Sequence, residues 1–219
     1  MRSSRRNSGT AWLLAVIAVT TAVTGISAHR RDEYLQAARL AIEPAAVQLD
    51  LDLTPGIALA DGIIADIDRN RDGSLSPDEQ QAYAAQVVNA LTLAADGLPV
   101  RAQLTGSNFS DVGAMRRGEG SIRIRVAGTL PRLSAGSHQL LFRNRHHPDR
   151  SVYLANALVP ESYQVSVTGQ RRDEVQSEIT IDYVLRAAPA RATAAWLLGG
   201  IAVAAGLSAL ALKPLRSLR

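Results

Sequence analysis

The chain contains no cysteine among its 219 residues. A disulfide framework, a thiolate metal site and a cysteine nucleophile are therefore excluded. Stability has to come from a hydrophobic core, with a bound ion as a further source. The absence is compatible with an oxidising compartment, because such a compartment permits disulfides without requiring them.

The motifs of common hydrolases are also absent. The chain has no G-x-S-x-G elbow, no H-E-x-x-H helix and no phosphate-cradling glycine loop. Asp50 and Asp52 share one face of an expected strand and are the nearest approach to a carboxylate pair. A solvated strand face explains them equally well. We expect no catalytic residues and no enzyme activity; an enzyme would need a cleft with perturbed ionisable groups.

The net charge of +4 is not spread evenly along the chain. Six of the 24 cations lie at the two ends: Arg2, Arg5, Arg6, Lys213, Arg216 and Arg219. The remaining 18 cations face all 20 acids, which gives the middle of the chain a net charge of −2. This pattern is typical of charges that flank membrane segments and not of a nucleic-acid interface, so no nucleic-acid partner is expected.

Residues 1–28 have the layout of a signal peptide. A basic start is followed by the apolar run AWLLAVIAVTTAVTGISA, which ends in small residues at Ala28. Cleavage is expected after Ala28. Ile26 at the −3 position is larger than the usual residue there, which leaves an uncleaved signal anchor as the alternative.

A second apolar run, ATAAWLLGGIAVAAGLSALAL, covers residues 192–212 without a charge. Its 21 residues, at about 1.5 Å each, can cross a hydrocarbon core of roughly 30 Å. We expect a transmembrane helix over 191–212 and a basic cytoplasmic tail over 213–219. Residues 29–190 then form an exported domain on a single-pass protein of the cell membrane, on the periplasmic or extracytoplasmic side.

The exported part predicts a mostly β fold. The stretch AVQLDLDLT at 46–54 alternates apolar and polar residues strictly, as a half-buried strand does. Further strands are expected in seven places: two around Asp96-Gly97 within 91–104, then within 121–128, 137–144, 151–158, 162–169 and 177–185. About eight strands with turn-rich gaps predict an Ig-like antiparallel β-sandwich with a helical insertion after its first strand. Residues 106–121 are expected to be a long loop with Arg116 and Arg117 at its tip.

The stretch DRNRDGSLSPDE at residues 68–79 carries oxygen-bearing side chains at alternate positions. Calcium prefers six to eight hard oxygen ligands in flexible geometry. The candidate ligands at positions 1, 3, 5, 7, 9 and 12 are Asp68, Asn70, Asp72, Ser74, Ser76 and Glu79. Gly73 at position 6 permits the sharp turn that such a loop needs. The stretch resembles the EF-hand calcium-binding family at each of these positions.

The resemblance implies specific roles within the loop. Ser74 would bind calcium through its backbone carbonyl, Ser76 through a water, and Glu79 through both carboxylate oxygens. Leu75 at position 8 would face a core or a partner hand. EF-hands usually work in pairs, and this chain shows one loop. A lone hand is expected to be weaker, structural, or completed by another chain.

The flanks of the loop predict the helix-loop-helix order, with the insertion at 55–90. Ser76 is expected to cap the second helix, with Pro77 in its first turn and Glu79 three residues after the cap. Upstream, Thr54 and Pro55 suggest a similar start for the first helix. The apolar stripe of that helix is expected to consist of Leu59, Ala60, Ile63, Ile64 and Ile67.

The histidines suggest an alternative function. His146 and His147 are adjacent, and with His138 or His29 they are a candidate site for nickel, copper or zinc. The stretches HRRDEYLQAARLAIEP and RSVYLANALVPES are similar to exported segments that precede nickel/cobalt permease-type membrane bundles of the hydrogenase and urease accessory class. This similarity implies an extracytoplasmic accessory to divalent metal transport, without the permease itself in these residues.

The sequence thus predicts a membrane-tethered exported module in which one calcium ion stabilises a β-sandwich that interacts with another membrane or exported protein.

Overall fold

The computed structural model describes residues 33–188; the expected signal segment, membrane helix and tail lie outside this range. The strands are β1 (Tyr34–Glu43), β2 (Ala46–Pro55), β3 (Leu91–Ala95), β4 (Leu98–Pro99), β5 (Ala102–Phe109), β6 (Ile122–Thr129), β7 (Gly136–Asn144), β8 (Ser151–Ala157), β9 (Val165–Arg172) and β10 (Glu178–Leu185). The helices are α1 (Ile57–Ile67), α2 (Pro77–Asn89) and α3 (Val112–Arg116). No helix among these residues is long and apolar enough to cross a membrane.

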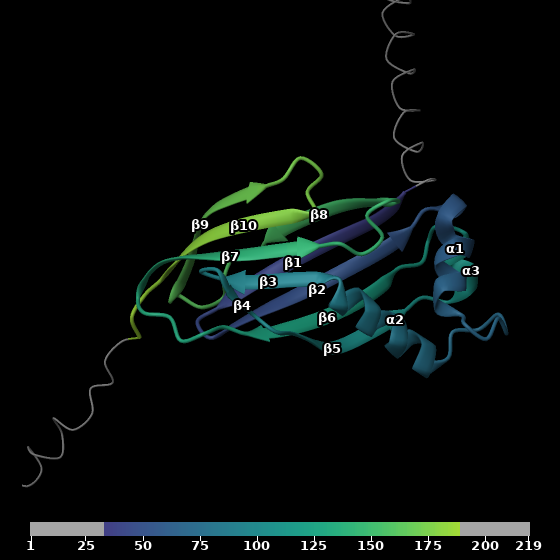
Figure 1. Cartoon of the computed structure of the whole chain (residues 1–219), viewed down its shortest axis with the longest axis horizontal. Coiled ribbons are helices and arrows are strands. Elements are labelled where there is room, and N and C mark those ends of the chain that lie inside the picture. The colour runs from purple at the N-terminus through teal and green to yellow at the C-terminus, as the bar shows by residue number, and fades with distance from the viewer. Residues whose placement is uncertain (1–32, 189–219) are drawn as a thin grey trace, which may run out of the picture. The chain divides into compact units, whose positions relative to one another are not determined.

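The described residues are mostly β and form two five-stranded sheets, consistent with a β-sandwich. One sheet has the order β5-β6-β2-β1-β8, and the other has the order β4-β3-β7-β10-β9 (Figure 1). The pairs within each sheet are antiparallel except one, because β8 runs parallel to β1. The expected antiparallel arrangement is therefore found in these pairs except β1–β8, at this edge of the first sheet.

The period-two pattern of apolar residues explains how the sheets share one core. In β2 the alternate residues Val47, Leu49, Leu51 and Leu53 are all buried, and the residues between them are at least partly exposed. The same alternation runs through β6 and β10. Because successive strand residues point to opposite faces, each strand contributes one buried row to a core that both sheets enclose.

The sequence did not predict β1, and it placed β9 too early in the chain. Strand β1 precedes the strand expected to be first, so the helical insertion follows the second strand. Strand β9 begins at Val165, three residues after the start of the expected segment. The expected long loop at 106–121 instead contains the end of β5 and all of α3. Asp111 starts α3 by accepting a hydrogen bond from the Ala114 N–H at 2.9 Å.

The helix pair that frames residues 68–79 has the predicted order. Helix α2 begins with a complete capping box, in which Ser76 and Glu79 each accept a hydrogen bond from the other's backbone N–H. The start of α1 differs from the expectation, because Thr54 and Pro55 belong to β2 and Gly56 is the N-cap without a side-chain cap. The expected apolar face of α1 is nonetheless the buried face.

The helices lie at one end of the two sheets, and the chain enters and leaves the sheets at opposite ends (Figure 1). Strand β1 begins at Tyr34, which pairs with Pro55 just before α1. Strand β10 ends at Leu185, which pairs with Gly136 and Val165 at the other end. The sheets therefore separate the helical end from the point where the chain continues to its C-terminal residues.

Candidate functional site: the loop at residues 68–79 and the contacts of its helices

The first half of the loop is organised by the carboxylates of Asp68 and Asp72. Asp68 accepts hydrogen bonds from the backbone N–H of Asp72 at 3.1 Å and of Gly73 at 2.9 Å. Asp72 accepts from the N–H of Ser74 at 2.8 Å and from the side chain of Asn70 at 2.9 Å. Gly73 has a φ of +83°, a conformation that costs glycine nothing. These residues fold the backbone around the side chains that the sequence proposed as ligands.

Glu79 ties the two sides of the loop together. Its Oε1 accepts hydrogen bonds from the backbone N–H of Arg69 at 2.9 Å and of Asn70 at 3.3 Å. Its Oε2 accepts from the N–H of Ser76 at 3.0 Å and from the Ser76 hydroxyl at 2.7 Å. One side chain therefore joins the residues that enter the loop to the residues that leave it.

The hydrogen bonds keep two of the carboxylates ionised. The side-chain hydrogen bond from Ser76, followed by the backbone bonds, lowers the pKa of Glu79. The side-chain hydrogen bond from Ser74 is the main reason that the pKa of Asp72 is lowered. A carboxylate that accepts hydrogen bonds in its charged form retains its negative charge at neutral pH. The loop therefore offers concentrated negative charge and oxygen ligands.

The described residues nevertheless contain no group of three or more His, Cys, Asp or Glu side chains placed to hold a metal ion. In the loop, the carboxylates accept hydrogen bonds from loop amides and hydroxyls. Each ionised carboxylate has about four acceptor positions, so these hydrogen bonds leave positions at which an ion can bind. The residues that fit calcium are therefore neighbours along the loop and would have to draw closer around the ion.

Leu75, at position 8 of the loop, packs against residues of the same chain. It is partly buried against the hydrophobic core. A hollow of about 500 Å³ beside it is lined by Leu75, Phe109 and Val112, which belong to the loop, β5 and α3. In a pair of EF-hands, position 8 of one loop faces the other hand. Here it faces α3 and the end of β5, which belong to the segment predicted as a long loop. Arg116 of α3 also forms an ion pair with Asp61 of α1 at 2.7 Å.

A buried hydrogen-bond chain joins α2 to the sheets. The Tyr83 hydroxyl lies 2.9 Å from the Tyr34 hydroxyl and 3.0 Å from His146 Nε2. All three residues are buried. The chain is satisfied when Tyr34 donates to Tyr83 and Tyr83 donates to a neutral His146. We call these three residues the tyrosine–histidine latch. Nothing in the sequence pointed to it, because 49 residues separate the two tyrosines and 63 separate Tyr83 from His146.

The His146 end of the latch is held by its own neighbours. Its backbone N–H donates to Asn144 Oδ1 at 2.9 Å. Its carbonyl accepts from the Gln36 amide and from the Tyr153 hydroxyl, each at 2.8 Å. Gln36 in turn accepts from the Asn144 amide at 2.7 Å. This buried polar network fixes the imidazole at the position that Tyr83 meets.

Burial sets the protonation state of the latch. Burial, with smaller contributions from nearby His147 and Arg150, lowers the pKa of His146 to about 3. Burial also lowers the pKa of His147, whose Nε2 lies 3.5 Å from Asp66 of α1. His146 is therefore neutral at physiological pH and can accept the hydrogen bond from Tyr83.

Among the described residues, His138, His146 and His147 are not brought together as the transition-metal site considered as the alternative. The rings of His146 and His147 lie 4.2 Å apart, but His146 Nε2 is engaged with Tyr83. His138 is part of β7, where it pairs with Asp96 at 2.7 Å and with the carbonyl of Ser134 at 2.8 Å. His29 lies outside the described residues.

The carboxylates Asp50 and Asp52 lie on the outer face of the first sheet beside arginines. Asp52 forms ion pairs with Arg39 at 2.7 Å and with Arg123 at 3.3 Å. Asp50 lies opposite Arg39 and Arg125 in the strand register. Because arginines on both neighbouring strands, β1 and β6, lie beside these carboxylates, the geometry gives no support to an acid–base pair.

Comparison with known protein families and with curated proteins found no match for this chain.

The latch predicts a specific acid sensitivity. Because the folded protein keeps His146 neutral, the unfolded chain binds more protons at this residue below a pH of about 6.5, the ordinary pKa of histidine. The free energy of unfolding should therefore fall as the pH decreases from 6.5, by up to about 1.4 kcal/mol per pH unit from this group. In His146→Gln the fall between about pH 5 and 6.5 should be shallower. Urea unfolding across this range measures it.

His138→Gln is the matched control. The hydrogen bond to Asp96 raises the pKa of His138, so the stability it contributes is full below about pH 6.5 and is lost at higher pH. His138→Gln should therefore leave the slope between about pH 5 and 6.5 unchanged. Equal slopes in His146→Gln and the wild type would contradict the assignment to His146.

Proposed function

We propose that this chain is a membrane-tethered exported module in which one calcium ion, bound at residues 68–79, locks α1 and α2 onto an Ig-like β-sandwich used for interaction with another membrane or exported protein. The observation that carries the proposal is the placement of Glu79. It joins both sides of the loop and lies four residues, about one helical turn, before Tyr83 of the latch.

The ligands would be the six positions predicted from the sequence. Asp68, Asn70, Asp72 and Glu79 would bind through their side chains, Ser74 through its carbonyl, and Ser76 through a water. Calcium would neutralise carboxylates that repel one another across a short loop. It would thereby fix the orientation of the end of α1 relative to the start of α2.

The segment β5–α3 supports a lone hand that works without a second one. Leu75 packs beside Phe109 and Val112, and the ion pair between Asp61 and Arg116 joins α1 to α3. These contacts supply from within the chain the support that a second hand usually gives. The proposed role of the ion is therefore structural, because the helices it orders are already packed against the sheets.

The expected gain in stability is modest but measurable. Extracellular EF-hand modules bind calcium with dissociation constants of about 0.1–1 mM. At about 2 mM calcium and a dissociation constant of about 0.1 mM, the ion stabilises the folded state by about 1.8 kcal/mol. For a domain of about this size, that corresponds to a rise in Tm of about 4–7 °C.

The membrane tether is proposed from residues 191–212, with the tail 213–219 on the cytoplasmic side. This part of the chain lies outside the described residues. The support comes from the uncharged length of the run and from the cations that follow it. The domain between the two apolar runs would then occupy the extracytoplasmic side.

Glu79→Gln should abolish the calcium-dependent rise in Tm of the full chain in detergent. The substitution removes the charge and the bidentate carboxylate that closes the ligand shell. The comparison is made within each variant, with and without calcium, because Glu79 also caps α2 and its loss lowers the stability of the calcium-free protein. Asp78→Asn is the matched control, since it removes a neighbouring charge that is exposed and outside the ligand positions. An undiminished rise in Glu79→Gln would refute the proposed site, and isothermal titration should give one ion per chain.

Tyr83→Phe should weaken calcium binding about five-fold even though Tyr83 is not a ligand. Loss of the hydroxyl leaves Tyr34 and His146 without their partner and favours states in which α2 is undocked, so part of the binding energy is spent on redocking. Tyr153→Phe also removes a buried hydrogen bond to His146, but it does not touch α2. Calorimetric titration compares the calcium affinities of Tyr83→Phe and Tyr153→Phe. Equal affinities would show that docking of α2 and calcium binding are independent.

A further inference from the structure

Residues 158–163, in the connection between β8 and β9, concentrate exposed apolar side chains. Eight large hydrophobic side chains are exposed among residues 33–188, and three of them fall within these six residues. Leu158, Val159 and Tyr163 are exposed by 40%, 90% and 65%. An exposed fraction of 90% means that Val159 protrudes from the surface at the rim of the hollow described below. We call residues 158–163 the apolar tip.

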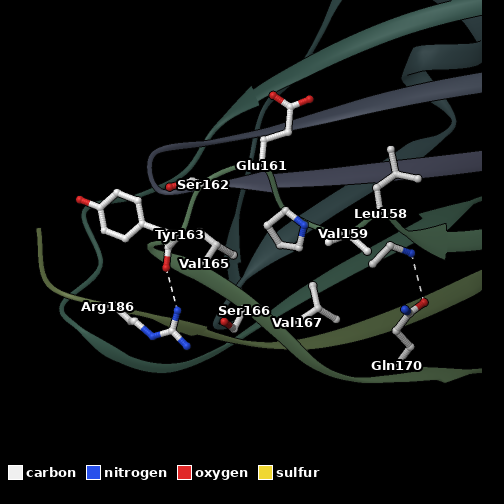
Figure 2. A pocket seen from close by; sticks show the side chains of 12 residues that line it. Leu158, Val159, Glu161, Ser162, Tyr163, Val165, Ser166, Val167, Gln170 and Arg186 are labelled. Atoms are coloured by element: carbon white, nitrogen blue, oxygen red, sulfur yellow. Dashed lines mark hydrogen bonds between the residues drawn. The ribbon is translucent and has the colours of Figure 1, made fainter.

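The apolar tip is held in place by hydrogen bonds. Arg186 donates from its guanidinium to the carbonyl of Tyr163 and from its backbone N–H to the carbonyl of Gln164, each at 2.7 Å. Below the tip lies a hollow of about 540 Å³, into which Val165 and Val167 contribute side chains (Figure 2). Tyr163 also lines this hollow, and its ring lies at the left edge of the view (Figure 2). The tip therefore presents its apolar side chains on a fixed base.

The tip lies at the end of the sheets where the chain continues toward the proposed membrane helix. Leu158 donates its N–H to the carbonyl of Leu40, which is six residues, or about 20 Å, along β1 from the helical end. Arg186, which is bonded to the tip, is the residue that follows β10. From Arg186 to Ala192, the first residue of the apolar run, the extended chain spans at most about 22 Å. The proposed tether therefore keeps the tip close to the bilayer surface.

We infer that the apolar tip inserts into the lipid bilayer that holds the tether, with Val159 and Tyr163 as the inserted side chains; this inference rests on the membrane anchoring proposed above. Tyrosine suits the interface because its ring is apolar and its hydroxyl is polar. Arg186 at the base of the tip can meet lipid phosphate groups. A protruding valine suits insertion into lipid, and a protein partner would more often meet a broader patch.

The tether makes a small insertion effective. Two or three side chains give weak binding to a membrane from free solution. A short linker holds the tip at a high effective concentration next to the bilayer, so the same contact becomes populated. Insertion would orient the strands roughly perpendicular to the membrane surface. Helices α1 and α2 and the loop at residues 68–79 would then face away from the membrane, where a partner and calcium can reach them.

The absence of cysteine allows a direct test on the full chain. Val159→Cys and Val175→Cys each introduce a single thiol that can carry a fluorescent label. Val175 is the matched control, because it is also an exposed valine but lies in the turn between β9 and β10, at the opposite end of β10 from Arg186 and the tip. Both labelled proteins are reconstituted into phosphatidylcholine vesicles containing a shallow spin-labelled lipid quencher, and matching Tm values verify that they fold alike.

The inference predicts a roughly two-fold loss of fluorescence at position 159 and none at position 175, because insertion of about 5–10 Å brings only the first label to the quencher. Flotation of the vesicles in alkaline carbonate is measured in parallel. Chain that floats with the lipid but shows no quenching at position 159 overturns the insertion and leaves the anchor standing. Quenching at both positions also overturns it, since the sheets would then lie flat. Chain that does not float refutes the anchor, and the insertion with it.

Discussion

The contact of Tyr83 with Tyr34 and His146 is the interaction on which the position of the helices depends. The two helices inserted between β2 and β3 flank a loop rich in carboxylates, and each buries an apolar face in the core. A buried polar contact adds a specific orientation to this packing. The buried hydroxyl of Tyr83 supplies that orientation, since moving α2 away would leave the Tyr34 hydroxyl and His146 Nε2 in the core without their partner. Asp66 of α1, which lies beside His147, adds a second contact from the other helix.

The loop and the latch act through the same face of α2. Glu79 and Tyr83 are four residues apart, and both are buried. The geometry of the loop therefore determines where the first turn of α2 lies, and that turn determines whether Tyr83 reaches Tyr34. An ion that tightens the loop would act on the sheets through this one turn, which is why we regard the proposed calcium site and the latch as one functional unit.

Local signals predicted much of this structure, and long-range contacts account for what they missed. The strict alternation in β2 and the Ser76–Glu79 capping box are patterns within a few residues, and both are observed. Strand β1 was missed because its buried row includes Gln36, a polar residue made stable there by Asn144, 108 positions away. The same holds for α3, which has five residues and relies on contacts with α1. The spacing of the oxygen-bearing loop residues is visible in the sequence, and their role as calcium ligands stays a prediction. The latch beside them was not predictable, since no periodicity relates Tyr83 to His146.

Hydrogen exchange of the full chain, with and without calcium, tests most directly whether an ion at residues 68–79 holds the helices to the sheets. The account predicts that calcium slows exchange throughout α1 and α2, including the amides around Tyr83 that lie beyond the loop, because undocking of the helices becomes rarer. Slower exchange confined to residues 68–79, or no change at all, would contradict it: the ion would then bind without acting on the latch, or would not bind.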